Sequence, residues 1–300
     1  GMWLALEPPG RPERSLGSVV ATATAGPLRL GAGSIRDHIV GCTVATGDGR
    51  VVHAGGRVVK NVAGYDLTKL QVGGFGGFGV ITELHVRLRA LPRADVTLLA
   101  RGPRDRLTAA ARTFTAEGIA PMAAELLSPA LAAESEWALA VRFAGTDAAV
   151  LAGARDLQSA TDLAWQPLPA ERSAGFWALA ARAVLGGPVT LRLGVLADGL
   201  DDTLDIVTRD LDEGLVSAGA AAGMLRWTGD ATADRLRAIR RLTAAREIPM
   251  TLERAPWPLR ASVGHFGAYR EGVGRLVDRL RETFDPNLSL RVALDGDDGG

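Results

Sequence analysis

The chain has 300 residues, of which 34 are Lys or Arg and 34 are Asp or Glu, so its formal net charge is zero. This balance provides no steering field, and neither nucleic acid nor an anionic membrane surface is an expected partner. The single cysteine, Cys42, excludes an internal disulfide or a thiolate zinc site. No apolar run is long enough to predict a membrane span, and the four histidines show no metal-ligand spacing, so a cytoplasmic protein without a metal is expected.

The first 92 residues are rich in glycine and contain only short candidate elements. Alternating apolar residues predict strands at 39–46, 51–54, 57–59 and 80–88. Gly47-Asp48-Gly49 predicts a hairpin turn between the first two strands. Pro92 ends this part, and the expected domain boundary lies between 1–92 and 93–300.

The remainder, 93–300, alternates longer strands and helices. Strands are expected at 95–100, 122–127, 137–143, 189–196, 223–227 and 249–253. Helices are expected at 103–116, 147–160, 171–184, 200–216, 231–244 and 268–283, with a linker at 163–169. This order predicts an α+β fold, an antiparallel sheet with helices on one face, and no internal repeat is visible.

The stretch 55–83 is the most informative of the chain because it contains eight glycines between two candidate strands. Glycine is costly in ordered backbone, so this density indicates close approach of the main chain to another group. One interpretation is a phosphate-bearing cofactor held by main-chain N–H groups. The other is a turn that only allows two elements to pack.

Three of these glycines, Gly74, Gly76 and Gly79, have the G-x-G-x-x-G spacing of dinucleotide-binding sites. That site requires a strand before the glycines and a helix after them. Here the preceding residues read as a helical turn and the following ones, 80–88, as a strand. A Rossmann-type site is therefore not expected.

Several segments resemble a known family. They are 60–67 (KNVAGYDL) with 72–83 (VGGFGGFGVITE), 7–9 with 15–22, 25–27 with 33–37, and the ending Phe284-Asp285-Pro286. Together they resemble the FAD-linked oxidases of the vanillyl-alcohol oxidase (PCMH-type) superfamily. Within it they are similar to the FAD-binding E subunits of bacterial glycolate oxidases.

The resemblance implies the fold and the cofactor site. It implies that 1–92 form the second FAD-binding lobe of a PCMH-type domain, and that 93–300 form an antiparallel-sheet cap domain whose last helix returns to the lobe. In this family FAD lies extended between two lobes, held largely by backbone amides. The implied FAD-binding residues are Gly17, Ser18, Gly26, Arg36, Lys60, Gly74, Gly76, Gly79, Val80 and Ile81. For Arg36 an ion pair with Asp37 or another acid is the alternative, and for Lys60 a solvated surface role.

The sequence also departs from the family pattern. Gly74 and Gly77 stand where the family has Ser and Thr, and Ser18 replaces a glycine. No segment matches the first FAD lobe, so we expect this chain alone to bind FAD weakly or not at all. Bare apolar surface is then expected to favour a homodimer or partner subunits.

Two residues outside the lobe are weak catalytic candidates. Arg192, in the middle of a strand, is a candidate for binding a carboxylate or for an ordinary ion pair. His265, between Gly264 and Phe266 in a loop before the last helix, is a candidate base or a surface or packing residue.

Two functions remain open. The resemblance implies an FAD-dependent oxidoreductase that oxidises a small 2-hydroxy acid by hydride transfer to the flavin, working with partner subunits that associate peripherally with the inner membrane. The alternative is a non-catalytic interaction subunit that keeps the fold and binds FAD weakly or not at all.

Overall fold

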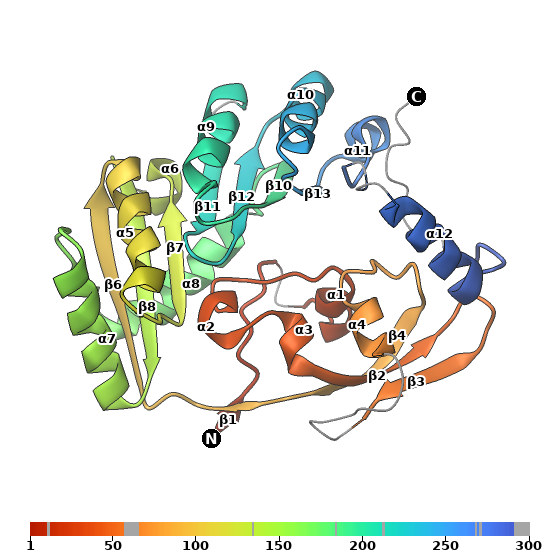
Figure 1. The fold of residues 1–300 in the computed structure, drawn as a ribbon, viewed down its shortest axis with the longest axis horizontal. Coiled ribbons are helices and arrows are strands. Elements are labelled where there is room, and N and C mark those ends of the chain that lie inside the picture. The colour runs from red at the N-terminus through yellow and green to blue at the C-terminus, as the bar shows by residue number, and fades with distance from the viewer. Residues whose placement is uncertain are drawn as a thin grey trace.

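The chain folds around two antiparallel sheets, one of three strands and one of eight (Figure 1). We call residues 1–92, which contain the small sheet, the N-terminal lobe, and residues 93–267, which contain the large one, the sheet unit. The structure, a computed structural model, describes residues 1–290 apart from 11–12, 57–65, 134, 184, 212–213, 268 and 270–271.

The small sheet has the strand order β3-β2-β4, and both pairings are antiparallel. Its strands are β2 (Ile39–Ala45), β3 (Val51–Gly55) and β4 (Val80–Val86). The predicted hairpin is confirmed, since Gly49 N donates to Thr46 O at 3.0 Å and Thr46 N to Arg50 O at 2.9 Å. The strand expected at 57–59 lies outside the described residues.

Three short helices, α1 (Leu16–Ala21), α3 (Ile35–His38) and α4 (Leu67–Gln71), cover this sheet. The fourth, α2 (Arg29–Ala32), contacts the large sheet instead, where Gly31 N donates to Met122 O at 3.0 Å. A further strand pair joins β1 (Met2–Trp3) to β5 (Arg89–Ala90). Ser15 caps α1, because its Oγ accepts a hydrogen bond from Ser18 N at 3.1 Å. Val19 and Val20 are then buried against Ile35 and Ile39, and these side chains form the core of the lobe.

The large sheet has the order β13-β10-β12-β11-β7-β8-β6-β9, with every pairing antiparallel. Its strands are β6 (Ala94–Gly102), β7 (Ala123–Leu127), β8 (Trp137–Gly145), β9 (Gln166–Leu168), β10 (Val189–Gly194), β11 (Gly214–Gly219), β12 (Met224–Gly229) and β13 (Met250–Arg254). The helices among them are α5 (Arg104–Ala116), α6 (Pro129–Ala132), α7 (Asp147–Ala160), α8 (Ala170–Ala183), α9 (Leu200–Asp210) and α10 (Ala233–Ala244). The expected linker at 163–169 contains the short strand β9.

The sheet unit contains a structural repeat that the sequence did not reveal. The elements β6-α5-β7-β8-α7-β9 and β10-α9-β11-β12-α10-β13 have the same βαββαβ order. In each, the third strand lies between the first two and the fourth lies outside the first. The second strands, β7 and β11, pair with each other and join the halves into one sheet. The repeat lies in the topology, which explains why reading the residues alone missed it.

Helices cover both faces of the large sheet, which corrects the expectation of one covered face. Side chains of α5, α7, α9 and α10 pack on one face with Leu98, whereas Trp177 of α8 packs on the other with Leu99. Neighbouring residues of a strand point to opposite faces, so Leu98 and Leu99 belong to different cores. Trp177 Nε1 donates to Thr97 Oγ1 at 2.9 Å, which satisfies its buried N–H.

The helix expected at 200–216 is too long. It ends at Asp210, and β11 begins at Gly214. The apolar spacing of α9 happens to continue into Leu215, which hides the boundary in the sequence. A Cβ at Gly214 would collide with the Trp227 ring, so the sheet requires a residue without a side chain there.

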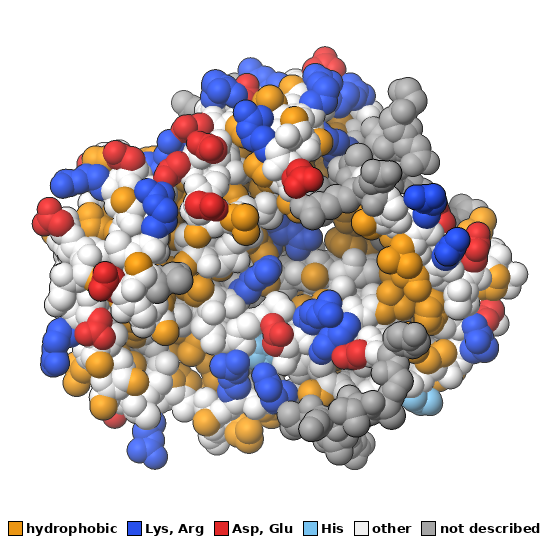
Figure 2. All heavy atoms as spheres, viewed as in Figure 1, with side chains coloured by type: hydrophobic (Ala, Val, Ile, Leu, Met, Phe, Trp, Pro, Cys, Tyr) orange, Lys and Arg blue, Asp and Glu red, His pale blue; other side chains and the backbone are white. Residues whose placement is uncertain are grey.

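The chain ends in two helices, α11 (Trp257–Val263), which the sequence did not predict, and α12 (Val273–Phe284). The end of α12 contacts the N-terminal lobe, because Gly47 N donates to Phe284 O at 2.8 Å and the Phe284 ring lies edge-on to Phe78. No residue of α12 is fully buried, and Figure 2 shows hydrophobic side chains gathered over this helix.

We expect Gly79→Ala to lower the free energy of unfolding by about 2–4 kcal/mol. Gly79 has a φ of +140°, and an added Cβ would collide with Val44 Cγ1 of β2. Gly102→Ala is the matched control, because its φ of +151° is similar but no atom lies within 4 Å of the added Cβ. Equal losses for the two variants in urea denaturation would contradict the steric explanation.

Candidate functional site

The glycine-rich turn lies between α4 and β4, as the sequence predicted, and is no Rossmann loop. Its amides donate largely to the protein's own carbonyls: Gly73 N to Val20 O at 3.0 Å, Phe75 N to Ala21 O at 2.8 Å and Gly77 N to Gly74 O at 2.8 Å. A Cβ at Gly74 would lie 2.9 Å from the Phe78 ring. Protein contacts therefore account for several of these glycines, and contact with a cofactor at Gly74, Gly76 and Gly79 stays a prediction.

Phe75, at the tip of the turn, joins the N-terminal lobe to the sheet unit. Its ring lies edge-on to His265 and Phe266, with centroid distances of 4.9 and 4.8 Å. Its φ of +50° is in the left-handed region, which is uncommon for a bulky residue. The turn thus directs an aromatic side chain into the junction between the two parts.

The remaining predicted site residues fall into two groups. Gly17 lies beside β4, because a Cβ there would be 3.9 Å from Ile81, and exposed Val80 is adjacent. Gly26 instead packs against the lobe's own chain, since a Cβ there would collide with the Glu7 carbonyl.

The predicted cations of the lobe lie elsewhere. Arg36 is exposed on α3, where the Asp37 carboxylate accepts from Ser34 N and Oγ, both at 2.8 Å, and caps the helix. Lys60 lies outside the described residues. The structure therefore brings Gly17, Ser18, Val80 and Ile81 together but not Arg36 or Gly26.

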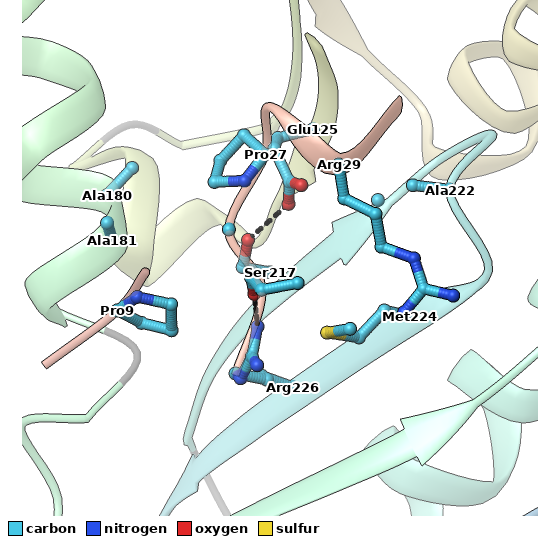
Figure 3. Close-up of a pocket in the computed structure, with 13 residues that line it drawn as sticks. Pro9, Pro27, Arg29, Glu125, Ala180, Ala181, Ser217, Ala222, Met224 and Arg226 are labelled. Atoms are coloured by element: carbon cyan, nitrogen blue, oxygen red, sulfur yellow. Dashed lines mark hydrogen bonds between the residues drawn. The ribbon is translucent and has the colours of Figure 1, made fainter. Parts of the chain in front are cut away.

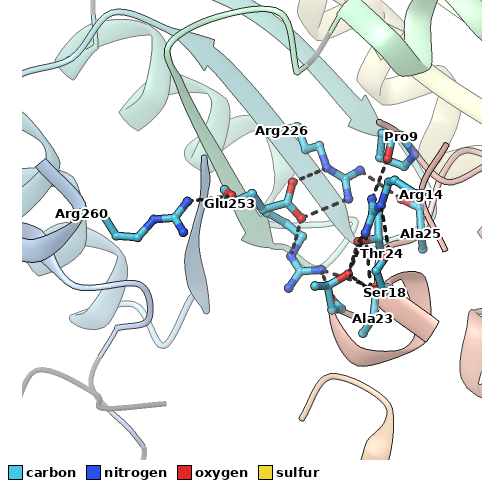
Figure 4. A network of polar contacts seen from close by, with 11 residues as sticks. Pro9, Arg14, Ser18, Ala23, Thr24, Ala25, Arg226, Glu253 and Arg260 are labelled. Atoms are coloured by element: carbon cyan, nitrogen blue, oxygen red, sulfur yellow. Dashed lines mark hydrogen bonds and ion pairs between the residues drawn. The ribbon is translucent and has the colours of Figure 1, made fainter. Parts of the chain in front are cut away.

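A charged network connects the sheet unit to the lobe (Figure 4). Arg192 of β10 and Arg226 of β12 are directly opposite each other in the sheet, and both contact the carboxylate of Glu253. The Arg192 Nε–Glu253 Oε1 distance is 3.3 Å and the Arg226 Nε–Glu253 Oε2 distance is 2.9 Å. Arg192 thus forms the ordinary ion pair that the sequence left open.

A β-bulge places Glu253 between the two arginines. Thr190 pairs with Arg254 and Leu191 with Leu252, so Glu253 is an extra residue on β13. Burial acts to raise the pKa of Glu253, but Arg226, Arg192 and Arg14 outweigh it and hold the pKa below its ordinary value. The carboxylate is therefore charged at neutral pH.

The same arginines bind main-chain carbonyls of the lobe after α1. Arg192 Nη1 donates to Ala23 O at 3.4 Å, and Arg226 Nη1 donates to Ala25 O at 3.1 Å. Arg14, from the lobe, donates to Thr22 and Thr24 hydroxyls at 3.0 and 3.1 Å. The network therefore fixes how the lobe and the sheet unit fit together.

A cavity of about 720 Å³ opens beside this network. It is lined by Gly10, Arg14, Thr22, Thr24, Phe75, Arg182, Leu185, Glu253, Arg254, Arg260 and His265. Four of these side chains are arginines, and Glu253 is the one acid among the described lining residues. The cavity is thus suited to an anionic ligand.

His265 lines this cavity and is only 8% exposed. Neither ring nitrogen has a hydrogen-bond partner within the described part of the chain, and the same holds for Arg260 Nε. Burial, with further contributions from Arg260 and Arg192, lowers the pKa of His265 to about 4, so the imidazole is neutral near pH 7. His265 is therefore a buried cavity residue, which corrects the option of a surface histidine.

Sequence reasoning missed Arg14, Arg226, Glu253 and Arg260. One signal was present, because Arg226 stands in the middle of an otherwise apolar strand, as Arg192 does. The other residues gave none, since a bulge and a contact between distant segments place them. Among the described residues no group of His, Cys, Asp or Glu is arranged to hold a metal ion.

A smaller pocket lies between α8, the lobe and the middle of the large sheet (Figure 3). Glu125 of β7 is buried in it and accepts a hydrogen bond from Ser217 Oγ at 2.6 Å. Burial raises the pKa of Glu125 to about 7, although the Ser217 hydrogen bond and Arg226 act in the opposite direction. This carboxyl therefore changes its charge near neutral pH.

Comparison with known proteins shows what part of the lobe is similar to. Residues 1–55 match the family described as FAD binding domain. The similarity to FAD-binding domains thus lies within the N-terminal lobe. A solved structure of alkyldihydroxyacetonephosphate synthase shares the fold, with a TM-score of 0.66 over 97% of this chain and 60% of that chain at 14% identity.

The relatives that are similar in sequence are named as oxidase subunits or dehydrogenases. Glycolate oxidase subunit GlcE of Escherichia coli (strain K12) is 44% identical over 99 residues, which are 33% of this chain and 28% of that protein. The mitochondrial D-lactate dehydrogenase [cytochrome] of Arabidopsis thaliana is 37% identical over 103 residues, 34% of this chain and 18% of that protein. Glycolate oxidase subunit GlcD of Bacillus subtilis (strain 168) is 34% identical over 115 residues, 38% of this chain and 24% of that protein. The matches thus span less than a third of each relative's length.

No helix in the described ranges is long and apolar enough to cross a membrane.

Replacing Glu253 by Gln is expected to lower the free energy of unfolding by about 2–4 kcal/mol at pH 7, because two opposed arginines lose their shared anion. The lowered pKa means that the wild-type advantage is present above pH 4.5 and is lost as the pH falls through the folded pKa. Urea denaturation at pH 7 and pH 4 measures this, with exposed Glu117→Gln as the control. A loss independent of pH would contradict the ionic explanation.

The raised pKa of Glu125 makes the stability of the protein change with pH in the direction opposite to that of Glu253. Its protonated form is favoured in the folded state, so wild-type stability falls by roughly 2–3 kcal/mol as the pH rises from 5 to 8. Glu125→Gln cannot ionise and is expected to remove most of this slope, whereas Glu117→Gln keeps it. Melting temperatures across this pH range provide the measurement, and an unchanged slope in Glu125→Gln would refute the assignment.

Proposed function

We propose that this chain is the FAD-binding part of a glycolate-oxidase-like oxidoreductase that acts on a small 2-hydroxy acid. The family match of the lobe and the named relatives support an FAD-linked 2-hydroxy-acid oxidoreductase at the level of the family. The cationic cavity between the lobe and the sheet unit supports a site for an organic acid next to the cofactor domain.

The described residues fit FAD in part. Exposed Val80 and partly exposed Gly17, Ser18 and Ile81 would offer main-chain groups to the adenosine half, while the amides of the glycine-rich turn are largely used within the protein. Arg14 supplies a cation where the lobe meets the cavity. FAD, when bound, would supply the oxidant that takes a hydride from the hydroxyl-bearing carbon.

The side chains of the cavity match the needs of a 2-hydroxy acid. The guanidinium of Arg260 would bind the carboxylate, because its Nε has no partner in the described structure. The neutral imidazole of His265 would accept the proton of the hydroxyl group. The observation that carries the proposal is this buried, neutral histidine with two unpartnered nitrogens in a cationic cavity.

The low pKa of His265 reflects its burial and the charges of the protein alone. Burial and the cations Arg260 and Arg192 lower it. A bound carboxylate adds a negative charge beside the same imidazole and raises its pKa toward the ordinary value, which makes it a better base. Substrate binding would thus prepare the histidine for proton transfer.

One observation favours the alternative, a non-catalytic subunit that stabilises a partner oxidase. The turn amides of Gly73, Phe75 and Gly77 already have carbonyl acceptors, which leaves fewer donors for a pyrophosphate. Two of the relatives are named as subunits of an oxidase. Association with partner subunits, or a homodimer, is part of both proposals.

FAD titration of the purified chain tests the preferred function. Under this function, FAD at saturating concentration binds in stoichiometric amount even where its affinity is low, and the flavin absorbance spectrum bleaches on anaerobic mixing with glycolate or lactate. His265→Asn should slow the bleaching by on the order of 100-fold while FAD affinity stays unchanged. His53→Asn, on the exposed side of β3, is the control.

The outcomes separate the two functions. A protein that takes up no FAD would refute autonomous flavin binding and support the interaction subunit. Bound FAD that no 2-hydroxy acid reduces would refute the proposed reaction. Equal bleaching rates for wild type and His265→Asn would remove the base role of His265.

A further inference from the structure

The cavity contains more positive charge than one carboxylate can neutralise. Arg14, Arg182, Arg254 and Arg260 line it, and none of them has an ion pair in the described part of the chain. The carboxylate of Glu253 contacts Arg192 and Arg226, two further cations beside the cavity. Glu253 is thus already committed to other arginines.

The four lining arginines do not form one cluster. Arg260 is partly buried near His265, and its Nη2 donates to Glu253 O at 3.2 Å. Arg14 is also partly buried, but it lies on the opposite side of Glu253 from Arg260 (Figure 4). Arg182 and Arg254 are exposed and come from α8 and the end of β13. Arg254 donates to the carbonyl of Leu185, just after α8, so these two cations share one edge of the cavity.

A partly buried cation at Arg260 and two exposed cations at the edge of the cavity favour a ligand with two anionic groups. Arginine binds carboxylates and phosphates through paired N–H donors. A monocarboxylate at Arg260 and His265 leaves Arg182 and Arg254 without an anion. A cavity of about 720 Å³ also leaves space beyond a molecule as small as lactate.

We propose that the ligand of this cavity is a 2-hydroxy acid that carries a second anionic group, either a carboxylate or a phosphate. The inference rests on the proposed function for the hydroxy-acid end. The first carboxylate lies at Arg260 beside His265, and the second anionic group lies between Arg182 and Arg254. These two arginines determine specificity and take no part in the reaction.

Calorimetric titration without added FAD tests this, using malate, 3-phosphoglycerate and lactate as probes. We expect malate or 3-phosphoglycerate to bind at least about tenfold more tightly than lactate. The double variant Arg182→Gln/Arg254→Gln should abolish this difference and leave lactate binding unchanged. Arg106→Gln, an exposed arginine on α5, should behave as wild type.

The two sources of the second charge are distinguished by which probe binds better, malate for a carboxylate and 3-phosphoglycerate for a phosphate. Equal affinity for all three acids, or no measurable binding of either malate or 3-phosphoglycerate, overturns the proposal. A double variant that weakens FAD uptake and retains the preference for these two acids also overturns it, because the two arginines would then serve the cofactor. FAD uptake is read separately from the absorbance spectrum, so a failure of the proposed function is not mistaken for a failure of this one.

Discussion

The shared carboxylate of Glu253 is the interaction on which the arrangement of this protein depends. Arg192 and Arg226 face each other across neighbouring strands, a placement that repels unless an anion lies between them. The bulge on β13 brings Glu253 to that position, and the neutralised arginines then bind carbonyls of the loop after α1. The ion pairs of Glu253 therefore join the sheet that carries the cavity to the lobe whose residues 1–55 match an FAD-binding domain.

The large sheet shows why such a junction can form. Two βαββαβ halves join through β7 and β11, which gives an eight-stranded surface whose one face is covered by four helices. The other face is covered in part by α8 and in part by the lobe. Polar residues on that second face, among them Glu125, Arg192 and Arg226, lie where the lobe approaches, and they explain why the two pockets occur at this contact.

The glycine-rich turn shows how one sequence feature can support two interpretations. Its positive φ angles and lack of side chains let it pack against α1 and β2, and it also delivers Phe75 to the wall of the cavity. A glycine needed for close packing and a glycine needed for close approach of a cofactor look identical in a sequence, because both only require the absence of a Cβ. The family match shows that residues 1–55 are similar to FAD-binding domains, whereas the geometry of the turn shows which of its glycines are needed for packing within the protein.

The sequence by itself determined the α+β class, the hairpin at Gly47-Asp48-Gly49, most helices and strands of the sheet unit, and the resemblance to FAD-linked oxidases. These follow from local periodicity, turn residues and short contiguous segments, which a chain carries in its order. Only the tertiary structure decided that the sheet consists of two joined halves, that α8 covers the opposite face, and that Arg14, Glu253, Arg260 and His265 meet at one cavity. These residues are far apart in the chain, and what brings them together is strand pairing, a one-residue bulge and the burial of charge, none of which leaves a periodic signal.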